Sequence, residues 1–174
     1  MKRFYDSVKK RLVYIGQEAT PDMWDERWGK EDLLRLFFLR RYSLESNLIR
    51  EMTGKFLRKG AKILEGGCGL GDKVFILKKS GYEVVGVDYA AQAVGRLNKV
   101  MPDLDIRYGD LRELPFPDSS FDGYWSFGVI EHAYDGFQEI AREMYRVLRP
   151  EGFLFLTVPA ISRLRRLKAV AGLY

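Results

Sequence analysis

The residues most able to do chemistry lie in a glycine-rich stretch, 63–72, which reads ILEGGCGLGD. Its glycines follow a G-x-G-x-G spacing between a predicted strand and a predicted helix, where the backbone must turn tightly and can approach a ligand closely. A dinucleotide-binding loop would place a small residue where this chain has Asp72, at the helix N-terminus that receives the pyrophosphate. Asp72 and the nearby Glu65 therefore disfavour an anionic ligand and suit one that carries positive charge. No Lys-Ser or Lys-Thr pair follows, which excludes a P-loop, and a glycine turn without a ligand is the alternative interpretation.

Two further carboxylates follow predicted strands. Asp88 ends the run VVGVD, and Asp110 comes shortly after the run that ends at Tyr108. The carboxyl ends of parallel strands meet at one edge of the sheet, where such sheets bind ligands. Asp88 could accept hydrogen bonds there from the 2′ and 3′ hydroxyls of a ribose, and capping the helix predicted over 90–100 is an alternative role. Asp110 could accept a hydrogen bond from an adenine amino group, and the backbone N–H of Leu111 could donate one to a ring nitrogen.

The chain has one histidine, His132, and one cysteine, Cys68. This scarcity excludes a disulfide framework and a zinc site built from these two residue types, and no metal site is predicted. Cys68 is interpreted as a small residue in a tight loop rather than a nucleophile, because nothing near it supplies a base. His132 follows the fourth predicted strand and is the one imidazole available as a catalytic base, with lining of the pocket as its alternative role.

A parallel sheet is needed to bring these residues together. From residue 61 onward, short apolar runs alternate with helical patterns, which is typical of repeated strand–helix–strand units. The predicted fold class is α/β, a Rossmann-like, doubly wound, mostly parallel sheet. Five strands are predicted, over 62–65, 83–87, 105–108, 123–127 and 152–158, with helices over 72–80, 91–100 and 137–148.

Residues 1–60 are predicted to form a helical N-terminal cap or lid, without strands, ahead of a domain that spans 61–174. A helix over 44–59 gathers its apolar side chains on one face, which predicts packing against the sheet. The candidates to cover a bound ligand are Trp24, Trp28, Phe37 and Phe38, with contacts expected from Trp28 and Arg27. Packing against the core is the alternative for these aromatic residues.

Composition indicates one ordinary globular domain. The chain has 174 residues, of which 47% are hydrophobic, and its 29 Lys and Arg against 24 Asp and Glu give a net charge of +5. Solvated helix faces are the preferred explanation of this mild excess, so nucleic acid is not expected as a partner, and a patch that binds nucleic acid or an anionic surface is the alternative. No apolar run approaches the roughly 18 residues of a membrane span, and the N-terminus lacks the apolar region of a signal peptide. We therefore expect a cytoplasmic protein.

Taken in order, these motifs resemble one family. The segments ILEGGCGLGD, VVGVDYA, YGDLRELPFPDSSFD, GVIEHAYD and VLRPEGFLFLTVP are similar to those of the class I S-adenosylmethionine-dependent methyltransferases, especially the ubiquinone/menaquinone-biosynthesis type. The resemblance covers about residues 61–160. It implies S-adenosylmethionine as cofactor and a small-molecule methyl acceptor, whose identity no motif encodes.

The resemblance also assigns roles to individual residues. It implies that Glu65 orients the ammonium group of the cofactor, that Asp88 binds the ribose diol and that Tyr89 packs on the adenine. The loop that begins at Phe127 would offer a backbone carbonyl to the ammonium group. The complete predicted cofactor-binding set is Glu65, Gly66, Gly67, Cys68, Gly69, Asp88, Tyr89, Asp110, Leu111, Phe127 and His132.

The end of the chain raises a structural question. Members of the family continue with a helix and two more strands, whereas this sequence stops at Tyr174, about one helix after the fifth strand. That strand would then be an apolar sheet edge, which proteins seldom leave bare. We expect it to be covered by the terminal helix, by a second subunit in a homo-oligomer or by the rest of a longer chain. Two other functions stay open: a cofactor-binding module without turnover, and a nicotinamide-dependent oxidoreductase, which the spacing and Asp72 disfavour.

Overall fold

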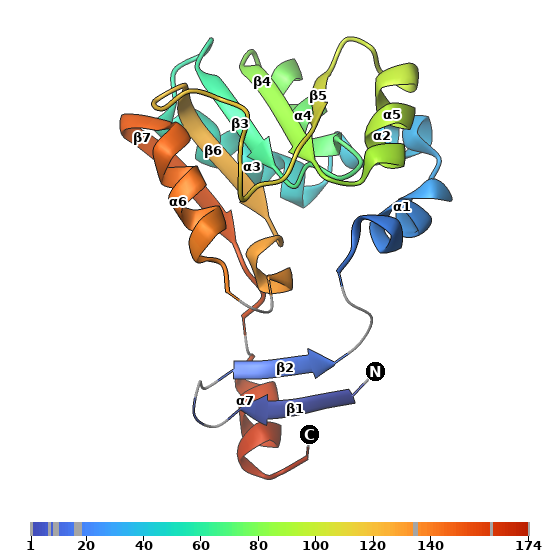
Figure 1. Ribbon diagram of the computed structural model, residues 1–174, viewed down its shortest axis with the longest axis vertical. Coiled ribbons are helices and arrows are strands. Elements are labelled where there is room, and N and C mark those ends of the chain that lie inside the picture. Colours follow the sequence, from blue (N-terminus) through green and yellow to red (C-terminus); the bar gives the residue numbers. More distant parts are fainter. Residues whose placement is uncertain are drawn as a thin grey trace.

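The structure, a computed structural model, describes residues 2–6, 8, 11–15, 19–133, 136–160 and 162–173. Its centre is a five-stranded sheet with the order β5-β4-β3-β6-β7, in which every neighbouring pair is parallel (Figure 1). The strands are β3 (Lys62–Gly66), β4 (Glu83–Asp88), β5 (Asp105–Tyr108), β6 (Phe121–Phe127) and β7 (Leu148–Thr157). The predicted fold class is confirmed, and all five predicted strands are present, although β6 begins two residues and β7 four residues earlier than predicted. Because β4 and β6 lie on opposite sides of β3, the strand order reverses there, and a ligand site is expected beside the carboxyl end of β3.

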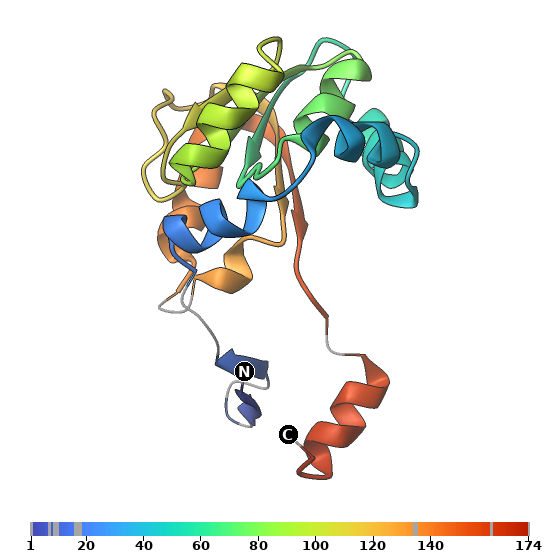
Figure 2. The ribbon, with the colours of Figure 1, turned by 90° about the vertical axis from the view of Figure 1, so that its right-hand side faces the viewer.

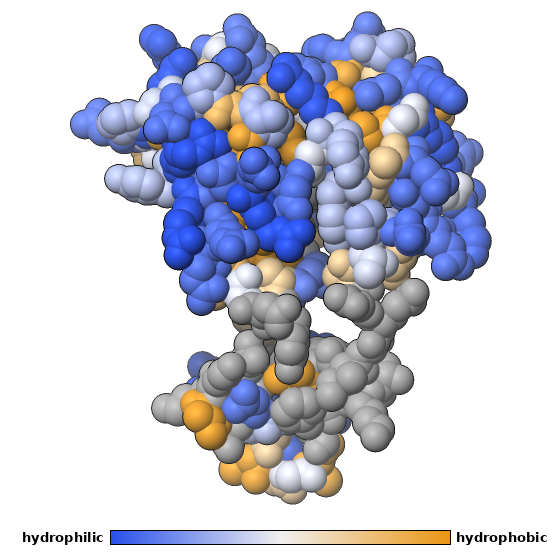
Figure 3. All heavy atoms as spheres, viewed as in Figure 1, coloured by the Kyte–Doolittle hydropathy of each residue, from blue (hydrophilic) through white to orange (hydrophobic). Residues whose placement is uncertain are grey.

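The alternation of side chains along the strands divides the core into two layers. Ile63 of β3 belongs to a cluster with residues of α2 (Leu33–Arg40), α3 (Leu44–Phe56), α4 (Asp72–Lys79) and α5 (Ala91–Val100). Its neighbour Leu64 belongs to a second cluster, formed with α6 (Gln138–Val147). Successive side chains of a strand point to opposite faces, so the sheet is covered on both sides. Figure 3 shows hydrophilic side chains over the outer surfaces of α6 and α5.

The first 60 residues contain the expected helices but also two strands. Helices α1 (Pro21–Gly29), α2 and α3 each follow an N-cap residue whose side chain accepts a hydrogen bond from the backbone of the first turn. These residues are Thr20, Asp32 and Ser43. Before them, β1 (Lys2–Asp6) pairs antiparallel with β2 (Arg11–Ile15). The prediction that residues 1–60 hold no strand was wrong, because the β-branched and aromatic residues of RLVYI favour a strand despite the dense charges around them.

The terminal helix does not cover the edge strand β7. Both views draw α7 (Arg163–Val170) beyond the carboxyl end of β7, on the same side of the molecule as β1 and β2 (Figures 1 and 2). Within β7, Phe153, Leu154 and Leu156 are 38%, 45% and 41% exposed. Of the three expected ways to cover this edge, coverage by the terminal helix was therefore wrong. In the described part of the chain, no helix is both long and apolar enough to cross a membrane.

Candidate functional site

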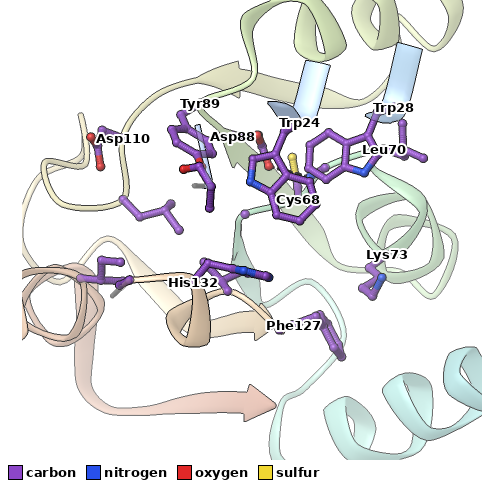
Figure 4. Close-up of a pocket in the computed structure, with 18 of the residues that line it drawn as sticks. Trp24, Trp28, Cys68, Leu70, Lys73, Asp88, Tyr89, Asp110, Phe127 and His132 are labelled. Carbon is purple, nitrogen blue, oxygen red and sulfur yellow. Dashed lines mark hydrogen bonds between the residues drawn. The ribbon is translucent and has the colours of Figure 1, made fainter. Parts of the chain in front are cut away.

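A pocket of about 380 Å³ opens at the carboxyl edge of the sheet, where the strand order reverses. This volume lies at the lower end of the range of small-molecule sites. Figure 4 shows its walls: the loop after β3, the ends of β4 and β6, and α1 on the outer side. Nine of the eleven predicted cofactor-binding residues line it: Gly67, Cys68, Gly69, Asp88, Tyr89, Asp110, Leu111, Phe127 and His132.

Glu65 and Gly66 lie beneath the pocket rather than in its wall. The Glu65 side chain is buried, it is hydrogen-bonded by the backbone of Val74, and burial raises the pKa of its carboxyl group well above the usual range. Its Oε2 atom has no hydrogen-bond partner among the described residues. A Cβ at Gly66 would lie 2.0 Å from the hydroxyl of Tyr124, so the absence of a side chain there serves packing.

The backbone N–H groups of the glycine loop are largely used within the protein. Gly67 and Cys68 both donate to the carbonyl oxygen of Val87, at 2.8 and 3.0 Å, and Gly69 donates to Asp88 Oδ2 at 2.8 Å. An anion-binding nest requires such N–H groups to be free and to converge on the ligand. These bonds therefore disfavour a pyrophosphate in this loop, in agreement with the sequence spacing.

Asp88 is the most deeply placed acceptor of the pocket. It is 2% exposed, and its two oxygens accept hydrogen bonds from Gly69 N–H at 2.8 Å and Ala90 N–H at 3.0 Å. Burial raises the pKa of its carboxyl group, while these backbone donors lower it. A carboxylate has about four acceptor positions, so Asp88 can still accept two hydrogen bonds from a ligand. Asp88 is not the N-cap residue of α5. That position is held by Ala90, which makes no side-chain hydrogen bond to the helix.

Tyr89 and Asp110 line the same side of the pocket. The Tyr89 hydroxyl donates to the backbone oxygen of Ala19 at 2.9 Å, which ties the ring to the segment before α1. The Asp110 carboxylate accepts hydrogen bonds from Nε and the backbone N–H of Arg112, and this pairing lowers the pKa of the carboxyl group. Sequence reasoning did not identify Arg112, although its position two residues after Asp110 could have suggested the ion pair.

Asp72 does not offer an unpaired negative charge to the pocket. Its carboxylate accepts a 2.8 Å hydrogen bond from Arg40 Nη1, and Lys73 Nζ lies 3.5 Å from its other oxygen. The argument that Asp72 makes the loop attractive to a cation is therefore corrected: two cations already compensate it. Arg40 comes from α2, so no local sequence signal could have identified it, and the pocket-lining Lys73 was also missed.

Aromatic rings close the outer side of the pocket. The rings of Trp24 and Trp28 on α1 lie 4.8 Å apart, and Trp24 meets the ring of His132 edge-on at 5.2 Å (Figure 4). A Cβ on Gly69 would lie 3.0 Å from Trp28, so the glycine loop and the tryptophan are in close approach. Cys68 is buried beneath them, and burial raises the pKa of its thiol, which argues against a nucleophile.

Comparison with known proteins gives a family context to this geometry. Residues 64–156 match the family described as a methyltransferase domain. An S-adenosylmethionine-dependent methyltransferase of Mycolicibacterium smegmatis is 40% identical over 154 residues, with 88% of this chain and 54% of that protein covered. The demethylmenaquinone methyltransferase of Staphylococcus aureus is 31% identical, with 87% of this chain and 70% of that protein covered.

A solved structure of an S-adenosyl-L-methionine-dependent methyltransferase from Methanococcus maripaludis has the same fold, with a TM-score of 0.66 at 16% identity. The match covers 92% of this chain and 74% of that one. The chain spans only about half the length of the mycobacterial relatives.

Proposed function

Since this chain belongs to the family of S-adenosylmethionine-dependent methyltransferases, we propose that it binds S-adenosylmethionine in the pocket at the carboxyl edge of the sheet and transfers the methyl group to a small-molecule acceptor. The observation that carries the proposal is the buried Asp88 carboxylate, held in the pocket by two backbone N–H groups. It would accept hydrogen bonds from both hydroxyls of the cofactor's ribose. Burial strengthens such bonds, because little water competes for the oxygens.

The neighbouring residues suit an adenine. Leu111 is 8% exposed and supplies an apolar wall, and Tyr89 is fixed by its bond to Ala19. Arg112 contacts both oxygens of Asp110, with two hydrogen bonds to each, so Asp110 would receive the adenine amino group in exchange for one of these contacts. These assignments make the β4 and β5 ends of the pocket the nucleoside side.

The ammonium end of the cofactor would lie toward Glu65, beneath the pocket wall, where the lining cations Arg40 and Lys73 are already paired with Asp72. Glu65 has a buried oxygen without a partner among the described residues, and such an atom is costly unless a donor reaches it. An ammonium group, directly or through a water molecule, would satisfy that oxygen and favour its ionised form. Phe127, in the opposite wall, would contribute its backbone carbonyl. The residues present therefore fit S-adenosylmethionine.

The cofactor, when bound, supplies a methyl group on an activated sulfonium. What the chain must contribute is alignment of donor and acceptor and exclusion of water. Trp24 and Trp28 perform the exclusion by covering the pocket, and the buried carboxylates fix the cofactor. A base is needed only if the acceptor must lose a proton, and His132, exposed on the facing loop, is the available imidazole.

The alternative is a chain that binds the cofactor without turnover, and this chain spans only about half the length of the Mycolicibacterium smegmatis relative. Calorimetry with S-adenosylmethionine and S-adenosylhomocysteine, followed by a methyl-transfer screen of small-molecule acceptors, tests both interpretations. Binding with transfer supports the methyltransferase, binding without transfer to any acceptor supports the alternative, and absence of binding contradicts both.

We also infer that a second copy of the chain covers the exposed β7 edge in a homo-oligomer, with coverage by the rest of a longer chain as the alternative. An unpaired parallel-sheet edge with three half-exposed large apolar side chains is a template for strand pairing between chains. Light scattering would give a dimer mass for the wild type and a monomer mass for Leu154→Lys. A wild type that stays monomeric at high concentration would contradict this assembly.

A further inference from the structure

Helix α5 begins without a capping side chain of its own. Its N-cap residue is Ala90, so the N–H groups of its first turn need acceptors from elsewhere. Asp25 of α1 supplies them: its Oδ1 accepts from Ala93 N–H at 2.8 Å and its Oδ2 from Gln92 N–H at 3.2 Å. A carboxylate at a helix N-terminus is also favoured by the helix dipole.

At the C-terminal end of α1, in turn, a side chain of α5 donates to backbone carbonyls of α1. Arg96, on α5, donates from Nη1 to the carbonyl oxygen of Gly29 at 2.6 Å and from Nη2 to that of Trp28 at 2.7 Å. Both are carbonyls of the last turn of α1, and that of Trp28 also accepts from Glu31 N–H at 3.2 Å. Each helix therefore completes the backbone hydrogen bonding of the other, and charged groups make all four bonds.

Apart from these bonds, α1 is held by its two tryptophans, of which Trp24 packs on the ring of His132 and Trp28 lies close to Gly69. None of its residues is fully buried, so apolar packing contributes less to its position than it does for α4 or α5. Elements with few buried contacts open locally at low cost in free energy. Yet α1 carries Trp24 and Trp28, the side chains that cover the pocket (Figure 4).

We propose that Asp25 and Arg96 form a latch that holds α1 closed over the pocket, and that opening of this latch limits the exchange of cofactor and product. The inference rests on the proposed function, because it takes S-adenosylmethionine and S-adenosylhomocysteine as the exchanging ligands. Asp25 and Arg96 are positioning residues, since neither lines the pocket. The latch also links α1 to the segment Asp88–Ala90, which leads directly into the capped turn of α5.

Stopped-flow tryptophan fluorescence with S-adenosylhomocysteine tests the latch in Asp25→Ala and Arg96→Ala. Alanine preserves helix propensity at both positions. Because a released lid opens more often whether or not the pocket is filled, the association and dissociation rates should both rise about tenfold, while Kd changes much less. A tenfold change in a rate corresponds to about 1.4 kcal/mol. Glu26→Ala and Lys99→Ala, exposed neighbours on the same two helices, are the matched controls and should leave both rates unchanged.

Hydrogen exchange of the free protein gives a second readout. Amides of α1 should exchange faster in both latch variants, whereas those of β3 and β4 should keep their protection. Unchanged ligand rates in both variants would overturn the latch while leaving the proposed function intact. A slower association together with a lower Tm would also overturn it, because that pattern indicates a damaged pocket. A wild type that does not bind S-adenosylhomocysteine would overturn the proposed function and the latch together.

Discussion

Replacing Asp88 by alanine is the most informative single perturbation of the pocket. The side chain is 2% exposed, and both of its oxygens already accept a backbone hydrogen bond within the protein. The change therefore removes the proposed acceptor for the ribose and also frees the N–H groups of Gly69 and Ala90. Its effect on ligand affinity must be separated from its effect on folding.

The magnitude for binding follows from the two hydrogen bonds that the ribose hydroxyls would donate. Hydrogen bonds to a charged group contribute about 1.5–3 kcal/mol each, so the loss is roughly 3–6 kcal/mol if both form. The lower value corresponds to about a hundredfold increase in Kd. We therefore expect S-adenosylhomocysteine to bind Asp88→Ala at least about a hundred times more weakly than the wild type.

The expected effect on stability is smaller. A buried N–H group left without a partner costs about 1–3 kcal/mol, and two are freed. Removal of a buried carboxylate whose pKa is raised by burial offsets part of this cost. For a chain of this length each kcal/mol shifts Tm by about 2–4 °C, so Tm should fall by several degrees.

The assay is isothermal titration calorimetry with S-adenosylhomocysteine, at a temperature where thermal unfolding shows that both proteins are folded. Asp103→Ala, which removes an exposed carboxylate outside the pocket, is the control and should bind like the wild type. Asp88→Asn retains one acceptor oxygen and should bind with intermediate affinity. A Kd for Asp88→Ala within threefold of the wild-type value would refute the ribose assignment, even if Tm falls.

Two further predictions concern the residues beneath the pocket. Because burial raises the folded-state pKa of Glu65 above the usual 4.5, its stabilising effect is full below pH 4.5 and is lost as pH rises through the folded-state pKa. Glu65→Gln should therefore gain Tm relative to the wild type as pH rises from about 4.5 to 8; a constant Tm difference across this range would contradict the buried, ionisable carboxyl. Gly66→Ala should lower Tm severely, because its Cβ would lie 2.0 Å from a fully buried tyrosine hydroxyl, whereas Gly95→Ala in α5, with open space around it, should stabilise by about 0.5–1 kcal/mol. Equal Tm values for the two glycine variants, measured by calorimetry, would show that the close packing at Gly66 is wrong.

The sequence alone determined the sheet and the location of the pocket. Asp88 and the glycine loop come at the ends of consecutive apolar runs. Parallel strands bring the ends of such runs to the same edge of the sheet, however the helices pack against it. This relation depends on local pattern and spacing, so it could be derived without knowing any distant contact. The same reasoning missed the β1–β2 hairpin, where local strand preference and dense charge gave opposite indications.

Only the tertiary structure decided how charges and helix ends are paired. Arg40 compensates Asp72 across 32 positions of the chain, and Asp25 caps α5 from 68 positions away. It also placed Glu65 beneath the pocket wall and α7 beyond the edge strand. Such pairings depend on how separately folded helices pack against the sheet, and each requires a donor and an acceptor to meet within about 3 Å. No residue spacing in the sequence encodes that distance, since it arises only when the core has formed.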